Sequence, residues 1–588
     1  MTGDRDDFRV RPGKGRNRGS GSLRSQSLAA QVRRAAARAG FARRGPRRGG
    51  GTGPLGRGRR AALVSRRSAS MRRVVIKARI VRHSGTRFRA APLARHIAYL
   101  ERDGVTRDGR DAAMFDARSD HADGAAFAMR CTDDRHHFRF IVSPEDAGEL
   151  ADLRSFTREL MDNVARDLET RLDWVALDHW NTDNPHIHIL VRGKAEDGAN
   201  LVIDRSYISH GMRDRAEARV TLELGPRSAR EIEQALARET MAERWTSLDR
   251  SLLARADEYG LVDMRPMKDV SREPRDALLT GRAQTLERLG LAAAAGPAQW
   301  VLDARLETRL RDLGDRGDII ATIHRAMRGA GEDVSAERLT IHPAAAREPI
   351  VGRLVDRGLH DELTGSAYAI VDGTDGRVHH LRFADLELTG DAQPGAIVEL
   401  RSWEGGGKAP RAVLAVRCDL PLDRQVTAGG ATWLDRQLLA NRDGAAHRGF
   451  GACLRAAMAA REDHLIAQGL AQRRGGQVIL APRLVETLRT RDLRECATRI
   501  AARTGLVPRD AAPGTPVAGT YRERVSLASG RFAMIDDGLG FQLVPWRPAL
   551  DRQLGQDVAG TINARGGVDW ALDRSRSRSR SLGLGLGL

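Results

Sequence analysis

Apolar and polar residues alternate along several segments between residues 72 and 192, a pattern typical of half-buried β-strands. The segments between them space their apolar residues as amphipathic helices do. A turn rich in Asn, Asp and Pro joins the last two strands and predicts a β-hairpin. We therefore predict an α+β unit, in which an antiparallel sheet carries helices on one face. The predicted strands are 72–82, 136–142, 173–179 and 186–192, and the predicted helices are 92–102 and a longer one from the N-cap Ser143 to about Arg171.

The second half of the chain contains a weak internal repeat. The pattern around Gly290 and Gln299 returns around Gly469 and Gln477, each time as a helix, a turn, a short strand pair and a helix. This is the outline of a winged helix, and a strand-rich stretch that we interpret as a small β-barrel follows each copy. Two generic modules could also look alike by chance. The expected segments are an Arg-rich disordered tail 1–70, the α+β unit 71–235, a helical linker 236–282, a winged-helix-like module 283–345, a β-barrel 346–420, a second helical module 421–515, a second β-barrel 516–573 and a low-complexity tail 574–588.

Charge is concentrated at the N-terminus. The 588 residues carry a formal charge of +20, and residues 1–70 hold eighteen Arg and one Lys against three Asp, which is +16 of that total. A flexible Arg-rich arm is suited to nucleic acid or another polyanion. Within it, residues 27–40 predict a short amphipathic helix. The alternatives are a solubilising tail, or a true start of the protein at Met71.

Other features of the composition exclude several classes of protein. No run of about 18 uncharged apolar residues occurs, so membrane insertion is not expected. The N-terminus lacks the apolar core of a signal peptide. The four cysteines form no CxxC pair, which argues against a disulfide scaffold and a cysteine zinc finger. A reducing cytoplasm fits this composition.

The segment HWNTDNPHIH holds the most specific pattern of the chain. His186 and His188 are two residues apart on a predicted strand, so both imidazoles leave the same face. The tight turn returns His179 to the same edge, beside Asp183, and three imidazoles can converge. Neutral imidazole is a common metal ligand, and three ligands leave positions open for water or a phosphate oxygen. The alternative is a polar strand whose histidines are merely exposed or hydrogen-bonded.

A candidate nucleophile precedes this cluster. Tyr99 lies on the predicted helix, on the same face as His96 and flanked by Arg95 and Arg102. A phenol with a pKa of about 10 is a poor nucleophile unless a metal, an arginine or a base favours its oxyanion. By spacing alone, Tyr99 could equally be a half-buried core aromatic.

These residues resemble a known family. HIAYLERDG (96–104) and HWNTDNPHIHILVRG (179–193) resemble the first and third motifs of conjugative relaxases, which are DNA-nicking HUH endonucleases. The match is closest to the P-type mobilisation family, related to the T-DNA border nuclease. RHHFRFIVSPEDA and VTLELGPRS also resemble segments of large relaxases that carry an uncharacterised C-terminal region. The resemblance covers about 72–230 and identifies 71–235 as a relaxase nuclease domain.

The resemblance implies a site- and strand-specific transesterification. Tyr99 would attack a backbone phosphate of single-stranded DNA at an origin of transfer, form a 5′-phosphotyrosyl link and free a 3′-OH. A divalent ion, Mg²⁺ or Mn²⁺, on the three histidines would bind the non-bridging oxygen; zinc or nickel could replace it in a purified sample. Asp183 would orient an imidazole or assist proton transfer, His96 is a candidate base, and Arg95, Arg102 and the tail would contact DNA.

The implied setting is bacterial conjugation or plasmid mobilisation. Expected partners are the coupling protein of a type IV secretion system and accessory relaxosome proteins, with the chain in the cytoplasm or carried with DNA into a recipient cell. Three other functions stay open: a rolling-circle replication initiator, a non-enzymatic DNA-binding regulator, and a three-histidine metallohydrolase. The chain has no GxxxxGK[ST] motif and hence no evident P-loop helicase of its own.

Overall fold

The computed structural model describes the chain from Arg57 to Ala571, with gaps. The described residues are 57–64, 70–83, 91–103, 106–108, 110, 113–180, 184–265, 274–342, 346, 348–405, 408–440, 444–564 and 566–571. The predicted helix at 27–40 lies outside them. Every helix among the described segments is too short or too polar to span a bilayer.

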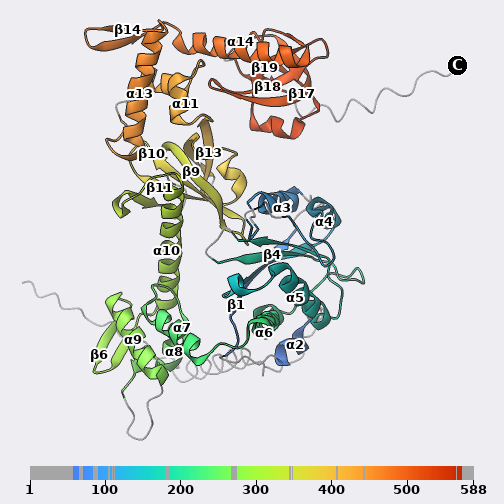
Figure 1. Cartoon of the computed structure of the whole chain (residues 1–588), viewed down its shortest axis with the longest axis vertical. Helices are drawn as coiled ribbons and strands as arrows, with labels where there is room; N and C mark the ends of the chain where they lie inside the picture. Colours follow the sequence, from blue (N-terminus) through green and yellow to red (C-terminus); the bar gives the residue numbers. More distant parts are fainter. Residues whose placement is uncertain are drawn as a thin grey trace, which may run out of the picture.

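The N-terminal body is built on a four-stranded antiparallel sheet (Figure 1). Its strand order is β1-β2-β4-β3. The strands are β1 (Val74–Arg82), β2 (His136–Pro144), β3 (Trp174–His179) and β4 (His186–Arg192). The helices are α2 (Arg59–Val64), α3 (Ala91–Asp103), α4 (Gly124–Arg130), η1 (Ala147–Glu149), α5 (Leu153–Asp167), η2 (Tyr207–Gly211) and α6 (Met212–Leu224).

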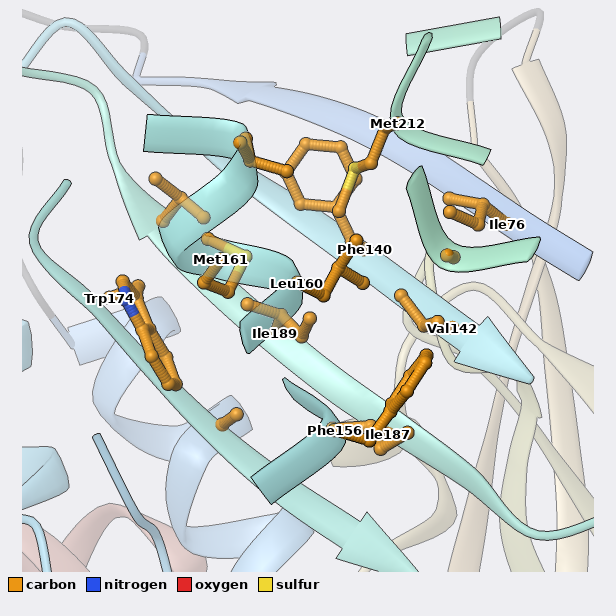
Figure 2. Packing of buried hydrophobic residues seen from close by; sticks show 14 of the residues in the cluster. Ile76, Phe140, Val142, Phe156, Leu160, Met161, Trp174, Ile187, Ile189 and Met212 are labelled. Atoms are coloured by element: carbon orange, nitrogen blue, oxygen red, sulfur yellow. The ribbon is translucent and has the colours of Figure 1, made fainter. Parts of the chain in front are cut away.

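Helices cover both faces of this sheet, which corrects the expectation of helices on one face. Ile187 and Ile189 of β4 face α5 and α6 and share a core with Phe156 and Leu160 (Figure 2). The alternate residue Leu190 points to the opposite face and joins a second core with α3 and α4. Each fully buried side chain of this size contributes roughly 1.5–3 kcal/mol, so both faces need a cover. The broader expectation of an α+β fold is met.

Helix α5 begins later than the sequence predicted. Ser143 and Pro144 still belong to β2, where Ser143 pairs with Val75 of β1. The helix starts at Leu153, because the side chain of Asp152 accepts hydrogen bonds from the backbone N–H groups of the first turn. The predicted N-cap at Ser143 is therefore wrong, since pairing in the sheet outweighs the local capping pattern.

Part of the expected disordered tail is ordered against the N-terminal body. Arg57 pairs with Ile203 in an isolated bridge, and its Nη1 donates to the carbonyl of Glu169 at 2.9 Å. Ala61 and Ala62 of α2 pack against the core of the sheet. The expectation that all of residues 1–70 is a disordered tail is wrong for this segment.

Two units follow, each with helices, a short hairpin and a six-stranded sheet. The first contains α7 (Ala229–Met241), α8 (Ser247–Arg255), β5 (Leu261–Asp263), α9 (Pro274–Arg288), β6 (Ala292–Gly296), β7 (Gln299–Leu302), α10 (Leu306–Gly329), η3 (Ala336–Arg338), β8 (Leu339–Ile341), β9 (Ile350–Asp361), β10 (Ser366–Gly373), β11 (Val378–Phe383), η4 (Leu386–Thr389), β12 (Ile397–Gly405) and β13 (Lys408–Cys418). The second contains α11 (Leu422–Thr427), α12 (Trp433–Ala440), α13 (Gly449–Ala467), β14 (Ala471–Arg474), β15 (Gln477–Leu480), α14 (Leu484–Thr504), β16 (Val507–Pro508), β17 (Pro516–Leu527), β18 (Gly530–Asp536), β19 (Gly540–Pro545), η5 (Pro548–Gln553), β20 (Asp557–Ile562) and β21 (Val568–Trp570).

The two six-stranded sheets have matching strand orders. They are β13-β12-β9-β10-β11-β8 and β21-β20-β17-β18-β19-β16, and in each the final pair is parallel. Long helices connect the parts: α10 runs from α7–α9 to the first sheet, α13 leads from that sheet to the β14–β15 hairpin, and α14 reaches the second sheet (Figure 1). Within the described residues neither sheet closes, so the two predicted β-barrels are wrong in that respect.

A buried ion pair occupies the same place in both helical parts. Arg282 of α9 binds Asp249 at 2.7 Å, and Arg461 of α13 binds Asp435 at 2.8 Å, with all four side chains fully buried. Each arginine also donates to backbone carbonyls of the segment before the aspartate. Like topology and a like ion pair indicate a duplicated unit.

Two expected boundaries fall inside helices, because residue 235 lies within α7 and residue 282 within α9. Residue 282 lies within α9, whose core extends from Leu248 to Leu310. The stretch 236–282 is thus part of the first helical core and not a linker. In that core the β6–β7 hairpin follows α9 and pairs with β5. The winged-helix assignment stays a prediction.

Candidate metal centre

Three histidines meet at one end of the β3–β4 hairpin. The register pairs His179 with His186, and His188 follows two residues along β4. All three side chains therefore leave the sheet on the face that α3 and α4 cover. Their ring centroids lie 4.6–5.3 Å apart, and all three residues are buried. The structure thus brings together the imidazoles that the spacing predicted to converge.

A carboxylate from a distant part of the chain completes the cluster. Glu362 lies in the turn between β9 and β10 of the first C-terminal unit. One of its carboxylate oxygens lies 3.1 Å from Nε2 of His186 and 3.1 Å from Nε2 of His188, and these two nitrogens are 3.2 Å apart. The ligand atoms of all four residues lie within 4.8 Å of one another, so the cluster could hold a metal ion.

The donor atoms fit a bound ion in spacing and type. A first-row or magnesium ion at roughly 2.0–2.2 Å from its ligands places neighbouring ligand atoms roughly 3.0–3.5 Å apart. The separations among Glu362, His186 and His188 fall in that range, while Nδ1 of His179 lies 3.9 Å from the other carboxylate oxygen of Glu362. In addition, Nε2 of His179 is buried without a hydrogen-bond partner, and an unsatisfied buried nitrogen is costly unless it has a ligand.

The pKa shifts of His179, His188 and Glu362 also suit coordination, because metal ligands must be deprotonated. Burial lowers the pKa of His179 to about 3 and lowers the pKa of His188. Burial opposes the charge of His186 as well, but the hydrogen bond with Glu362 outweighs it and raises that pKa. For Glu362, burial favours the neutral acid, yet its hydrogen bonds with His186 and His188 prevail and lower the pKa. Glu362 is thus a carboxylate at neutral pH.

Tyr99 lies on α3, which covers the same face of the sheet as the histidines. Its ring packs against the core of α3 and α4, as the core-aromatic alternative predicted. Its hydroxyl oxygen, however, accepts a hydrogen bond from the backbone N–H of Leu359 at 3.1 Å. The neighbouring Leu100 backbone is hydrogen-bonded to His179, and Leu359 is three residues from Glu362. The candidate nucleophile and the histidines therefore contact the same β9–β10 hairpin.

Of the other predicted site residues, the structure describes the side chain of His96 but not those of Arg95, Arg102 and Asp183. Burial lowers the pKa of His96 well below its usual value, with nearby Arg139 and His188 adding to the effect, so the imidazole is neutral. Arg95 and Arg102 belong to α3, but their side chains lie outside the described part of the chain. Asp183 lies outside it entirely.

A row of cationic side chains extends beside the histidines and was missed by the sequence analysis. Across the sheet, Lys77 is level with Ile141 and His188, and Arg79 is level with Arg139. These cations share the face of the histidines. Burial lowers the pKa of Arg139 to about 10, which leaves its guanidinium charged at neutral pH. Only the strand register reveals this row, since the three residues are scattered in sequence.

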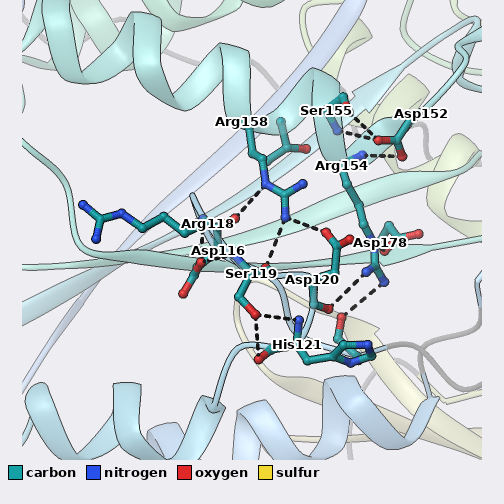
Figure 3. A network of polar contacts seen from close by, with 12 residues as sticks. Asp116, Arg118, Ser119, Asp120, His121, Asp152, Arg154, Ser155, Arg158 and Asp178 are labelled. Atoms are coloured by element: carbon teal, nitrogen blue, oxygen red, sulfur yellow. Dashed lines mark hydrogen bonds and ion pairs between the residues drawn. The ribbon is translucent and has the colours of Figure 1, made fainter.

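A polar network holds the end of β3, where the first histidine lies. Asp178, next to His179, accepts hydrogen bonds from Arg154 of α5 at 3.2 Å and from Trp180 at 2.8 Å. Arg154 and Arg158 also donate to the loop of residues 113–120 (Figure 3). The network fixes the strand end against a helix and a loop, which positions His179.

Tyr207, the nearest alternative nucleophile in the sequence, is not accessible. Its side chain is 1% exposed in the core of the N-terminal body, and its hydroxyl donates to Asp167 at 2.8 Å. Burial and that carboxylate raise its pKa. Both effects disfavour the phenolate, so Tyr207 is a structural residue.

The fold and the site thus define an α+β protein with a buried three-histidine, one-glutamate cluster and a duplicated C-terminal unit. A family model described as "Protein of unknown function (DUF3363)" matches residues 279–416 and 407–579. Because these matches span just over half of the chain, the chain belongs to this family. The two matches coincide with the two C-terminal sheets and the helices before them. No curated protein matches the chain. No solved structure matches it.

Proposed function

We propose that the protein is a relaxase, which nicks and religates single-stranded DNA at an origin of transfer through a phosphotyrosyl intermediate. One observation carries the proposal. A tyrosine hydroxyl and a buried three-histidine cluster lie under the same hairpin, on the one sheet face that also carries a row of cations. The tyrosine and histidine motifs resemble those of relaxases, and their contacts with one hairpin support the proposal.

In this proposal Tyr99 is the nucleophile. Its oxygen bonds to the scissile phosphorus, the bond from phosphorus to the 3′-oxygen breaks, and the phenolic proton passes to a base. His96, one turn earlier on α3, is neutral and is our candidate for that base. Religation reverses the step, since the covalent link conserves the energy of the phosphodiester.

The remaining residues position the phosphate. Lys77, Arg79 and Arg139 would neutralise the negative charge of the DNA phosphates. Such neutralisation is the main requirement of phosphoryl transfer. A divalent ion, for which we propose Mg²⁺ or Mn²⁺, would supply Lewis-acid polarisation of a non-bridging oxygen when held by His179, His186 and His188. Asp183, from the turn between two of these ligands, is assigned to imidazole orientation.

The proposed setting follows from the proposed activity. The partners would be single-stranded DNA, accessory relaxosome proteins and the coupling protein of a type IV secretion system. We place the protein in the bacterial cytoplasm, with the Arg-rich tail and the side chains of Arg95 and Arg102 as further DNA contacts.

The direct test is a denaturing gel with labelled single-stranded DNA carrying a matched origin sequence and Mn²⁺. A relaxase gives a labelled species of protein size that survives denaturation. A metallohydrolase gives cleaved DNA without that species, and a regulator gives neither; either result contradicts the proposal.

Single alanine variants test the role of the cluster. We expect His179→Ala, His186→Ala and His188→Ala each to lose Mn²⁺ binding and adduct formation together, because each removes a ligand. His121→Ala is the matched control, since His121 is exposed on the loop before α4. Isothermal titration with wild-type affinity in any of the three would remove that residue from the site.

A further inference from the structure

The β9–β10 hairpin of the first C-terminal unit reaches across the site of the N-terminal body. We call residues 359–363 the hairpin tip. Leu359 donates its backbone N–H to the hydroxyl of Tyr99, Glu362 joins the histidines, and the carbonyl of Leu363 accepts a hydrogen bond from Arg79 at 3.2 Å. The tip thus contacts the proposed nucleophile, the proposed ligands and the cationic row at once.

The turn that carries Glu362 has a defined structure. The side chain of Asp361 accepts hydrogen bonds from the backbone N–H groups of Leu363 and Thr364, at 2.9 and 3.2 Å. Gly365 closes the turn with a φ of +75°, a conformation that favours glycine, and its N–H donates to the carbonyl of Asp361. The turn therefore fixes the backbone of Glu362 and the direction in which its side chain leaves the chain.

Placing a carboxylate in this site is costly unless it has a partner. Desolvation of a buried carboxylate is costly, and its hydrogen bonds with two imidazoles offset only part of that cost. A divalent cation at the centre of the cluster would offset much more. It would also explain the chemistry of the donors, since three imidazoles alone suit hard ions poorly and a carboxylate oxygen suits them well.

We infer that Glu362 is the fourth protein ligand of the metal, so that the first C-terminal unit contributes directly to the nuclease site. An ion of six-fold coordination then keeps two positions for a phosphate oxygen and water. The Leu359 N–H, donated to the tyrosine oxygen, holds the nucleophile beside the cluster and favours its oxyanion. The inference rests on the proposed function for the role of Tyr99 but not for metal binding.

The test uses the full chain and Mn²⁺ alone as the probe. Isothermal titration and the electron paramagnetic resonance of bound Mn²⁺ are measured for the wild type, Glu362→Ala, Glu362→Gln and Glu362→Asp. The control is Glu337→Gln, which removes an equal charge from an exposed position of the same unit. Thermal melting without metal shows whether each variant is folded.

We expect Glu362→Gln and Glu362→Ala to weaken Mn²⁺ binding by at least about 10–100-fold, the usual effect of disturbing a ligand shell. Glu362→Asp should retain part of the affinity, and Glu337→Gln should bind as the wild type does. DNA adduct formation should fall in the glutamine variant and recover in excess Mn²⁺, whereas a purely structural loss would not be rescued by metal.

Two outcomes overturn the inference. Wild-type Mn²⁺ affinity in folded Glu362→Gln would show that Glu362 is not a ligand, while leaving the proposed function intact. Faster adduct formation by Glu362→Ala would show that the hairpin tip blocks the site and does not complete it. Conversely, weakened Mn²⁺ binding in the variants without any DNA adduct in the wild type would contradict the proposed function and leave the ligand assignment standing.

Discussion

Replacing Tyr99 by phenylalanine should abolish the covalent DNA adduct while the fold and DNA binding persist. The change removes one oxygen atom, and the ring can keep its packing against the core of α3 and α4. No cation of the site is altered. The variant therefore separates the chemical step from binding.

The cost of this change in the free energy of unfolding follows from the hydrogen bond between Tyr99 and Leu359. The Tyr99 hydroxyl accepts a hydrogen bond from the backbone N–H of Leu359 at 3.1 Å. Its loss leaves a backbone N–H without that acceptor and should destabilise the protein by about 1–2 kcal/mol. DNA affinity should change by less than about a factor of three, since counterion release depends on cations and not on a phenol.

The assay is a denaturing gel with labelled oligonucleotide for adduct formation, beside a native binding titration and urea unfolding. Tyr207→Phe is the matched control. It also removes one tyrosine oxygen, from the hydrogen bond with Asp167, and should lose about 1 kcal/mol of stability while it keeps full nicking. An adduct formed by Tyr99→Phe, or lost in folded Tyr207→Phe, would refute the assignment of the nucleophile.

Three further outcomes are expected. Arg461→Met leaves Asp435 buried without its cation and should cost about 3–5 kcal/mol in urea unfolding; a loss under 1 kcal/mol would refute this. At pH 8 a thiol reagent should modify only the exposed Cys453 of the native chain, because burial raises the pKa of Cys131 to about 12 and the other two cysteines are also buried; faster labelling of a buried cysteine would contradict the packing. A chain starting at Met71 should melt at a lower temperature, since it lacks the contacts of α2, yet it should still nick a short oligonucleotide. Its affinity for long DNA should depend less on salt: the slope of log affinity against log salt concentration should be smaller by several units, about one per lost phosphate contact. Equal slopes would show that the tail does not touch DNA.

The duplicated unit shows how a weak sequence repeat can carry a strong structural one. The repeat is visible in a few short segments, whereas both sheets share one strand order and both helical parts share one buried Arg–Asp pair. A buried arginine is tolerated only when its donors are satisfied, and here an aspartate and several carbonyls satisfy them in each copy. The pair is therefore a structural feature and not a candidate catalytic group.

The local parts of the candidate site could be predicted from the sequence. His179, His186 and His188 lie on two strands joined by one short turn, and the period of a strand dictates that their side chains share a face. Tyr99 and His96 are likewise related by one helical turn. Such relations hold wherever the hairpin and the helix are placed, so pattern and spacing suffice to predict them.

The surroundings of these groups could not be predicted from the sequence, because they depend on contacts between distant segments. Glu362 is 174 residues from His188 in the chain, and no local pattern marks a hairpin tip that reaches another domain. Contacts between distant segments also explain why α5 starts late and why helices cover both faces of the sheet. Strand pairing extends β2 past Ser143, and Leu190 needs an apolar cover on the face opposite Ile189. Long-range pairing and burial outweigh local propensity there, because they involve more free energy than a cap or a turn.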